Sequence, residues 1–145
     1  MLIVVDNSQG HSAYLEDALL FSQMNLRPGG KQARMCDTWF IHDGQKLDQP
    51  MVFPSNHPEF PNQPKGMRQV LIERGLWKDK LCMQCKSDCT SNLCCVKRIL
   101  ELQPDFKAQR SLVQEVIKEL GHICIFLPKF YCELNYIEFF WGAVK

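Results

Sequence analysis

The sequence has no strong excess of either charge, no long hydrophobic run, no internal repeat and no low-complexity tract. Its 17 basic and 16 acidic residues leave a formal net charge of +1, so no global field attracts a nucleic acid or an anionic membrane. The longest apolar run near the N-terminus, Met1 to Val5, is too short for a signal peptide or a membrane span. These absences predict a soluble protein that is not secreted and has no membrane partner.

Length and cysteine content set further bounds. The 145 residues correspond to one domain, and a hydrophobic content of 46% is enough to build a core. Eight cysteines without an export signal indicate a reducing compartment, where thiols stay free or bind metal. Proline and glycine concentrate between Arg27 and Gly66, which predicts a long irregular segment. Gly29, Gly30 and Lys31 do not make a phosphate-binding loop, because the upstream glycine of such a loop is missing.

A candidate acidic site follows the first predicted strand. Leu2 to Val5 is a run typical of a strand buried on both faces, and Asp6 comes directly after it. Ligand sites of open α/β sheets lie at the carboxyl ends of the strands, so Asp6 is a candidate catalytic residue. Asn7 and His11 lie in the same polar stretch and are candidate auxiliary residues. The alternative is an ordinary turn, in which Asp, Asn, Ser and Gly are common.

A second candidate acid lies near the other end of the chain. The apolar run Ile123 to Leu127 predicts a buried strand that leaves the core at Pro128. Asn135 is a good N-cap for a following helix, and Glu138 falls three residues later, on the first turn. Glu138 would then be held beside the end of a strand. Alternatively, Asn135 and Glu138 form a capping box and bind nothing.

Cysteine is concentrated in one place, with five thiols in the fourteen residues from 82 to 95, beginning with a Cys-x-x-Cys. Four thiolates can surround one tetrahedral zinc ion, which would let a short polar segment fold without a core of its own. Free or core thiols, or a redox pair, are the alternatives. The candidate zinc ligands are Cys82, Cys85, Cys89, Cys94 and Cys95. The remaining thiols, Cys36, Cys124 and Cys132, are expected as small core residues.

The N-terminal half predicts little regular structure. We expect a short helix within Tyr14 to Met24, with Ala18, Leu19 and Phe21 inward, before the stop at Pro28 to Gly30. The most extended pieces are Thr38 to Ile41 and Met51 to Phe53. Regular structure is then excluded for about a dozen residues by proline. The prolines concerned are Pro54, Pro58, Pro61 and Pro64.

The C-terminal half predicts helices. Lys65 to Gly75 has the period of a helix with one apolar face, made of Met67, Val70 and Leu71. A second helical face consists of Leu93, Val96, Ile99 and Leu100. After Pro104 a longer helix is expected, ending at Gly121. Its apolar side chains lie in a stripe on one face and are expected to be part of the core. That stripe consists of Phe106, Leu112, Val113, Val116, Ile117 and Leu120.

Two stretches resemble the catalytic motifs of mariner-type DDE transposases. Val5 to Ser12 is similar to the D-N-x-x-x-H motif that carries the second acid of that family. Pro128 to Gly142 is similar to the P-x-x-S-P-(D/E)-L-N-P-I-E-x-x-W-G motif, whose glutamate is the third acid. Tyr131, Cys132 and Tyr136 depart from that pattern, where the family has Ser, Pro and Pro. Short stretches similar to fungal relatives are Pro28 to Gln32, Lys65 to Met67 and Cys132 to Asn135.

The resemblance implies an α/β fold in which residues 1–145 are an incomplete ribonuclease-H-like domain, with a proline-rich and cysteine-rich insertion at about 27–104. Asp6 and Glu138 would be catalytic and bind Mg²⁺ or Mn²⁺, while Asn7, His11 and Asn135 would assist. Complete members of the DDE superfamily of endonucleases cut and transfer DNA at transposon ends in the nucleus. DNA is therefore the implied partner, and a homodimer is a further candidate.

The first acid of that family has no counterpart in this sequence, so we predict that this chain alone does not cut DNA. The alternative function is a zinc-stabilised interaction module of a decayed transposase, without catalysis. A thiol oxidoreductase based on Cys82 and Cys85 would need a Cys-x-x-Cys that opens a helix within a βαβ unit. The proline-rich and polar flanks of this pair argue against that function.

Overall fold

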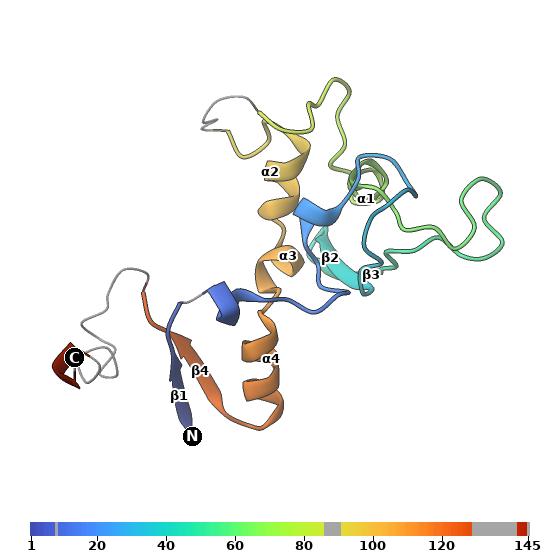
Figure 1. Ribbon diagram of the computed structural model, residues 1–145. Coiled ribbons are helices and arrows are strands. Elements are labelled where there is room, and N and C mark those ends of the chain that lie inside the picture. The colour runs from blue at the N-terminus through green and yellow to red at the C-terminus, as the bar shows by residue number, and fades with distance from the viewer. Residues whose placement is uncertain (8, 86–90, 129–141, 145) are drawn as a thin grey trace. The chain divides into compact units, whose positions relative to one another are not determined.

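The computed structural model describes residues 1–7, 9–85, 91–128 and 142–144 and shows a mixed α/β protein (Figure 1). The chain forms two compact units. Unit 1 contains residues 1–15 and 110–145, and unit 2 contains residues 16–109. The insertion predicted at about 27–104 lies within unit 2, which extends beyond that range at both ends.

Unit 1 is built on two parallel strands, β1 (Leu2–Val5) and β4 (Ile123–Phe126). Their register pairs Leu2 with Ile123 and Val5 with Phe126. The helix α4 (Leu112–Glu119) leads into β4 and contacts it. A short 3₁₀ helix, η1 (Gln9–Ser12), follows β1. Because the strands are parallel, both carboxyl ends lie at one edge of the sheet.

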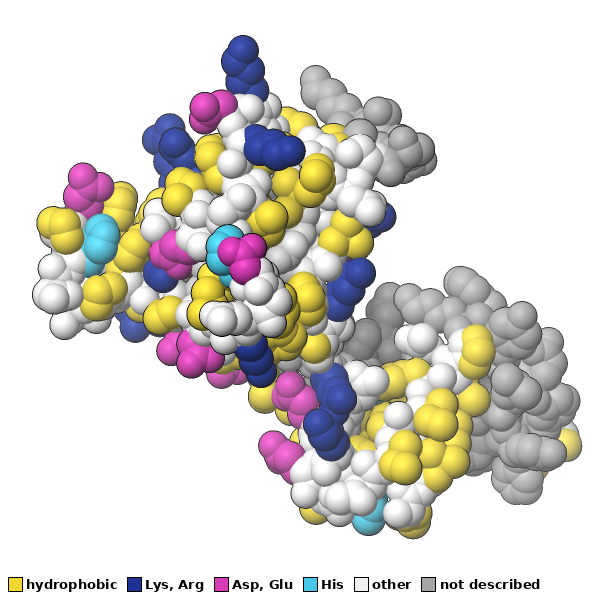
Figure 2. Space-filling model, turned by 180° about the vertical axis from the view of Figure 1, so that it is seen from behind, with side chains coloured by type: hydrophobic (Ala, Val, Ile, Leu, Met, Phe, Trp, Pro, Cys, Tyr) yellow, Lys and Arg dark blue, Asp and Glu magenta, His cyan; other side chains and the backbone are white. Residues whose placement is uncertain are grey.

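The prediction that the first strand is buried on both faces is wrong. Leu2 and Val4 are 55% and 54% exposed, and their partners Ile123 and Ile125 are 65% and 49% exposed. Side chains alternate between the two faces of a strand, so these four residues share one face, and α4 lies on the other. Hydrophobic side chains accordingly reach the surface of unit 1 in Figure 2. In the described part of the chain, helix covers only one face of this sheet.

Unit 2 contains a hairpin and three helices. The hairpin joins β2 (Thr38–His42) to β3 (Gln45–Gln49) through Asp43 and Gly44. Both turn residues have positive φ, 49° and 78°, as a type I′ turn requires. The helices are α1 (Met67–Glu73), α2 (Val96–Glu101) and α3 (Pro104–Ala108), and Phe21–Gln23 is a 3₁₀ helix, η2.

The core of unit 2 lies between α1, α2 and η2. The predicted inner face of α1 is confirmed, because Met67, Val70 and Leu71 are fully buried. Gly75, with φ +69°, follows the end of α1, as predicted for a helix stop. Other members of this core are Leu19, Met24, Met35, Met51, Val96, Ile99, Leu100 and Phe106.

Gly66 is required by a close approach between two backbone segments. A Cβ at this position would lie 2.5 Å from the carbonyl carbon of Arg27 and 2.6 Å from the carbonyl oxygen of Leu26. The neighbouring amides of Met67 and Arg68 donate to the carbonyl oxygens of Asn25 and Leu26. The free backbone amides at the first turn of α1 therefore have carbonyl acceptors in the loop at Asn25 and Leu26. This explains why the helix starts without a side-chain cap.

The helix predicted within Tyr14–Met24 is corrected, because distant residues bond to the backbone of this segment. Within Tyr14–Met24 the only helix is η2, although Ala18 and Leu19 are buried as expected. The amide of Leu19 donates to Gln109, and the carbonyl of Asp17 accepts from Cys36. These backbone groups are paired with distant residues and are not available to a helix.

The single helix expected from Pro104 to Gly121 is in fact α3 and α4. Gln109 has extended dihedrals, φ −61° and ψ 128°, and separates them. The predicted stripe is divided as well, since Phe106 is buried in unit 2 and Ile117 in unit 1. Leu112, Val116 and Leu120 are exposed. The extended pieces expected at Thr38–Ile41 and Met51–Phe53 are confirmed: the first lies in β2, and Val52 forms an antiparallel bridge with Pro64.

A buried ion pair joins four elements of unit 2. The Arg74 guanidinium donates to both Asp105 carboxylate oxygens, at 2.9 and 2.7 Å, and both side chains are 1% exposed. Asp105 also accepts from the Thr38 hydroxyl, and Arg74 donates from Nε to Gln49 at 2.8 Å. The pair therefore connects the end of α1 and the start of α3 to both hairpin strands.

Glu73 extends this network. Its carboxylate accepts from Lys65 Nζ at 2.9 Å and from the amides of Gln49 and Gln69 at 3.0 Å. Burial raises the pKa of Glu73, but these hydrogen bonds and the Lys65 charge outweigh it and hold the pKa below its usual value. Stability from Glu73 is thus present above the ordinary carboxyl pKa and is lost as the pH falls through the lowered one.

We predict that Arg74→Met destabilises unit 2 by about 3–5 kcal/mol, because it leaves the Asp105 carboxylate buried without its cation. Urea unfolding followed by the fluorescence of Trp39 and Trp77 measures this. Arg98→Met is the matched control, since the Arg98–Glu101 pair is exposed and such pairs contribute about 0–1 kcal/mol. An Arg74→Met loss as small as that of the control would contradict the assigned role.

We also predict that Glu73→Gln lowers stability at neutral pH and makes the melting temperature less sensitive to acid below the ordinary carboxyl pKa. The physical reason is that the neutral amide has no charge to lose in that range. Melting curves at a series of pH values test this, with the exposed Glu59→Gln as control. If the melting temperatures of the wild type and Glu73→Gln fall equally with acid, Glu73 does not cause the acid sensitivity of this protein.

Candidate metal centres

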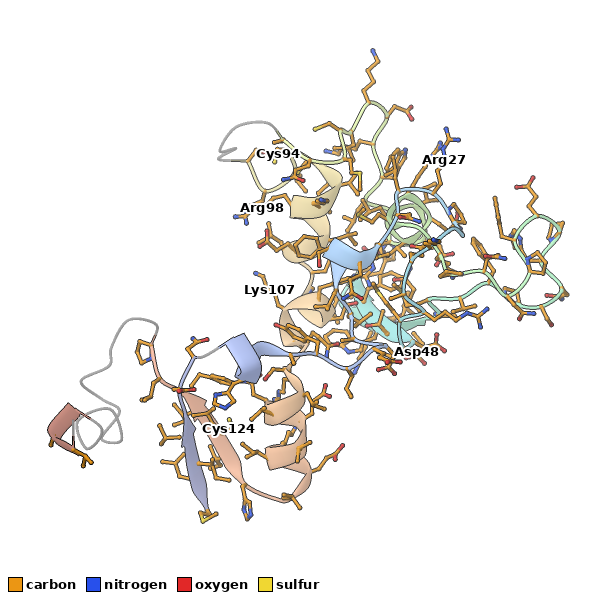
Figure 3. The ribbon with its side chains drawn as sticks, viewed as in Figure 1. Arg27, Asp48, Cys94, Arg98, Lys107 and Cys124 are labelled. Atoms are coloured by element: carbon orange, nitrogen blue, oxygen red, sulfur yellow. The ribbon has the colours of Figure 1, made fainter. Side chains whose placement is uncertain are left out.

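The cysteine-rich segment is held against the start of α2. Cys82 forms a parallel bridge with Cys95, and its carbonyl accepts from the amide of Val96 at 3.0 Å. The carbonyl of Met83 accepts from the amide of Lys97 in the same way. These bonds fold the Cys82–Cys85 turn over the start of α2, directly after Cys94 and the N-cap Cys95. Figure 3 shows Cys94 at this end of α2.

Four sulfurs gather there, and we call Cys82, Cys85, Cys94 and Cys95 the thiol site. The sulfurs of Cys85, Cys94 and Cys95 all lie within 4.8 Å of one another. The sulfur of Cys82 is 3.9 Å from that of Cys85. A zinc ion with Zn–S bonds of about 2.3 Å in a tetrahedron separates its sulfurs by about 3.8 Å. The mutual spacing of Cys85, Cys94 and Cys95 is thus close to what zinc requires, and Cys82 adjoins this group through Cys85.

The electrostatics of the thiol site favour the thiolate that metal binding needs. Burial raises the pKa of Cys95, which is 4% exposed. Hydrogen bonds from the backbone of Arg98 and Cys85 and from the thiols of Cys94 and Cys85 outweigh burial and hold the pKa below its usual value. Since only the thiolate is a good metal ligand, these contacts prepare Cys95 for a cation.

The thiol site fits zinc and does not fit magnesium. Soft thiolates select zinc, whereas Mg²⁺ takes oxygen ligands. The fifth predicted ligand, Cys89, lies outside the described residues. The redox alternative needs a helix that begins at the Cys-x-x-Cys, but Cys82 to Cys85 is non-helical and α2 begins only at Val96.

The acidic candidate lies in unit 1, directly after β1. Nδ1 of His11 is 2.5 Å from Oδ1 of Asp6 and 3.1 Å from the Asp6 carbonyl oxygen. The 3₁₀ turn η1 returns the chain so that His11 reaches back to the strand end. The two side chains are 41% and 43% exposed, so the pair is accessible to solvent. His11 thus orients the Asp6 carboxylate, a contact that sequence spacing did not predict.

The end of β4 lies beside Asp6. The amide of Leu127 donates to the carbonyl of Val5 at 2.8 Å, which continues the parallel pairing to the last residue before Asp6. Asn7 is exposed at the same edge. Glu138 and Asn135 lie outside the described residues. Among the residues that are described, no group of three or more metal ligands includes Asp6, so Mg²⁺ has no support from a ligand cluster.

The expectation that the isolated cysteines are small core residues is wrong for Cys36, which is exposed. Met35, 5% exposed, occupies the core in its place, because adjacent residues of an extended segment point to opposite sides. Cys124 is half-buried on β4, and Cys132 lies outside the described residues.

Comparisons of the chain with protein-family models, curated proteins and solved structures found no match. Within the described residues, no helix is both long enough and apolar enough to cross a bilayer.

We predict one zinc per chain, bound by the thiol site. The double variant Cys82→Ser/Cys85→Ser should lose it, because two of the four thiolates are removed, and a chelator should lower the melting temperature of the wild type. Elemental analysis of the purified protein and a thermal melt with EDTA measure both effects. Cys36→Ser, a change at an exposed thiol of the same unit, should keep its zinc. Full zinc retention in the double variant would exclude this site.

Proposed function

We propose that this chain is part of a DDE-type metal-dependent nuclease or transposase domain with a ribonuclease-H-like fold, and that its substrate is DNA. The observation that carries the proposal is the parallel pairing of β1 with β4. Asp6 and the segment that leads to the motif at 128–142 leave the sheet at the same edge as a result. In α/β sheets this is the edge where ligands bind.

The pairing brings Asp6 and Leu127, which leads into the second motif, to the same edge of the sheet, although they stand near opposite ends of the sequence. All of unit 2 lies between β1 and α4 in the sequence, yet β1 and β4 are neighbours. A turn formed by Asp6 and Asn7 alone would not require this arrangement. The arrangement supports the interpretation of Asp6 as a member of a metal site, in which Glu138 would be the second acid.

The donor at Asp6 fits a hard cation. Its carboxylate offers oxygen ligands, is partly open to solvent and is oriented by His11. Asp6 and Glu138 would hold Mg²⁺ or Mn²⁺, and such ions activate the attacking oxygen and stabilise the leaving oxygen in phosphodiester cleavage. Asn7 and Asn135 would position water or phosphate. With one family acid lacking a counterpart, the chain supplies an incomplete metal site.

A second candidate function is a zinc-stabilised interaction module without catalysis. The observation that favours it is the thiol site, whose four sulfurs would form a closed coordination shell of the structural type. A structural zinc leaves no open position for substrate. Under this function Asp6 and His11 form a local turn contact and bind no cation.

A manganese-binding experiment separates these two functions. In zinc-loaded, ¹⁵N-labelled protein, we predict that Mn²⁺ broadens the amide signals of residues near Asp6, because a paramagnetic ion relaxes nearby nuclei. Asp6→Asn and Glu138→Gln should each weaken this effect about tenfold or more, as the loss of a charged ligand does. Glu119→Gln is the matched control, an exposed acid at the end of α4.

A shared metal site would be refuted if the broadening survives Asp6→Asn. It would also be refuted if the broadening is lost in Asp6→Asn but unchanged in Glu138→Gln. Zinc bound without any manganese effect at Asp6 would favour the interaction module.

A further inference from the structure

We propose that a pocket in unit 1, formed along α4 and the first residues of β4, binds a phosphate group. The pocket has a volume of about 320 Å³, at the lower end of the range for small-ligand sites. Its lining consists of Arg110, Gln114, Lys118, His122, Ile123 and Cys124. Asp6 is not part of it, and the proposal does not depend on the nuclease function.

The local structure explains why these residues meet. Gln114 and Lys118 are four positions apart on α4, so they lie on the same side of the helix, and Arg110 comes just before the N-cap Ser111. At the other end, the amides of Gly121 and His122 bond back to Lys118 and Ile117, which closes the helix and starts β4. The turn brings His122 and Cys124 alongside the helix. Figure 3 shows Cys124 on β4.

The polar groups of the pocket are mainly hydrogen-bond donors. Lys118 and Arg110 carry permanent positive charge, and Arg110 has five N–H donors, more than a single partner takes. The side-chain oxygen of Gln114 accepts from the amide of Ser111 at 3.1 Å, so its NH₂ group is the part that can serve a ligand. Nδ1 of His122 lies 3.5 Å from the N-terminal ammonium of Met1, so Nε2 is the ring nitrogen that can donate to a ligand.

The lining contains no acidic side chain. The acids of α4, Glu115 and Glu119, follow Gln114 and Lys118 directly and are therefore turned about 100° away around the helix. A pocket with two fixed cations, a histidine and an amide donor suits an anion with several acceptor oxygens. Phosphate matches this requirement better than a carboxylate, because it offers more oxygens to separate donors.

The phosphate could belong to a free ion or nucleotide or to the backbone of DNA. The experiment uses the full-length, zinc-loaded chain with three probes: inorganic phosphate, a deoxynucleoside monophosphate and a short DNA duplex. Amide shifts of residues 114–124 report binding at the pocket, and calorimetry gives the affinity. Competition between the duplex and inorganic phosphate for the same shifts identifies the source.

Arg110→Gln and Lys118→Gln should each weaken phosphate binding about tenfold, because each removes a charge-assisted hydrogen bond. Lys118→Arg should keep binding, since it keeps the charge. Lys107→Gln is the matched control, an exposed lysine of α3 that is not in the lining, and should stay within about twofold. Circular dichroism checks that each variant keeps its helices.

Displacement of phosphate by the duplex supports a backbone ligand, and phosphate binding without displacement supports a free ion or nucleotide. The proposal is overturned if no probe shifts residues 114–124. It is also overturned if Arg110→Gln and Lys118→Gln bind phosphate as tightly as the wild type.

Discussion

The buried pair of Arg74 and Asp105 is the constraint on which unit 2 depends. Two charges taken out of water are stable only if every remaining hydrogen-bonding group is satisfied, and here Thr38, Gln49 and Gln103 do so. These partners come from both hairpin strands and from the residue before α3. The pair is formed only when all of these elements are in place, so it couples their positions. The helix α2, whose N-cap Cys95 belongs to the thiol site, packs within the same unit against α1 and α3.

The two candidate metal centres are chemically distinct and belong to different units. The thiol site in unit 2 offers soft sulfur ligands, and Asp6 in unit 1 offers oxygen. A zinc ion and a magnesium or manganese ion would therefore not compete for the same place. Among the residues that the structure describes, unit 1 has few buried side chains and one exposed apolar sheet face, whereas unit 2 has most of the core. Under the proposed function, unit 2 is a structured insertion and unit 1 is the part that carries chemistry.

Local patterns predicted several elements correctly. The buried face of α1, the strands at Leu2–Val5 and Ile123–Phe126, and the irregular proline segment follow from periodicity and from proline chemistry. Helix predictions from periodicity were wrong where distant residues bond to the backbone, as at Leu19 and Asp17. They were also wrong where one apolar stripe is divided between two units, as at Phe106 and Ile117. The turn of the hairpin is an Asp-Gly pair, Asp43 and Gly44, which is a local sequence signal for a type I′ turn.

The sequence by itself determined which residues could bind metal, because ligand chemistry is a property of the side chain and the Cys-x-x-Cys spacing places two sulfurs on one turn. It also determined that a helix would follow Gly66. Tertiary structure decided that Cys94 and Cys95 meet that turn, that His11 orients Asp6, and that Gly66 must lack a side chain beside Arg27. The physical reason is that periodicity acts over one or two turns of chain, whereas these contacts depend on which backbone segments pack together.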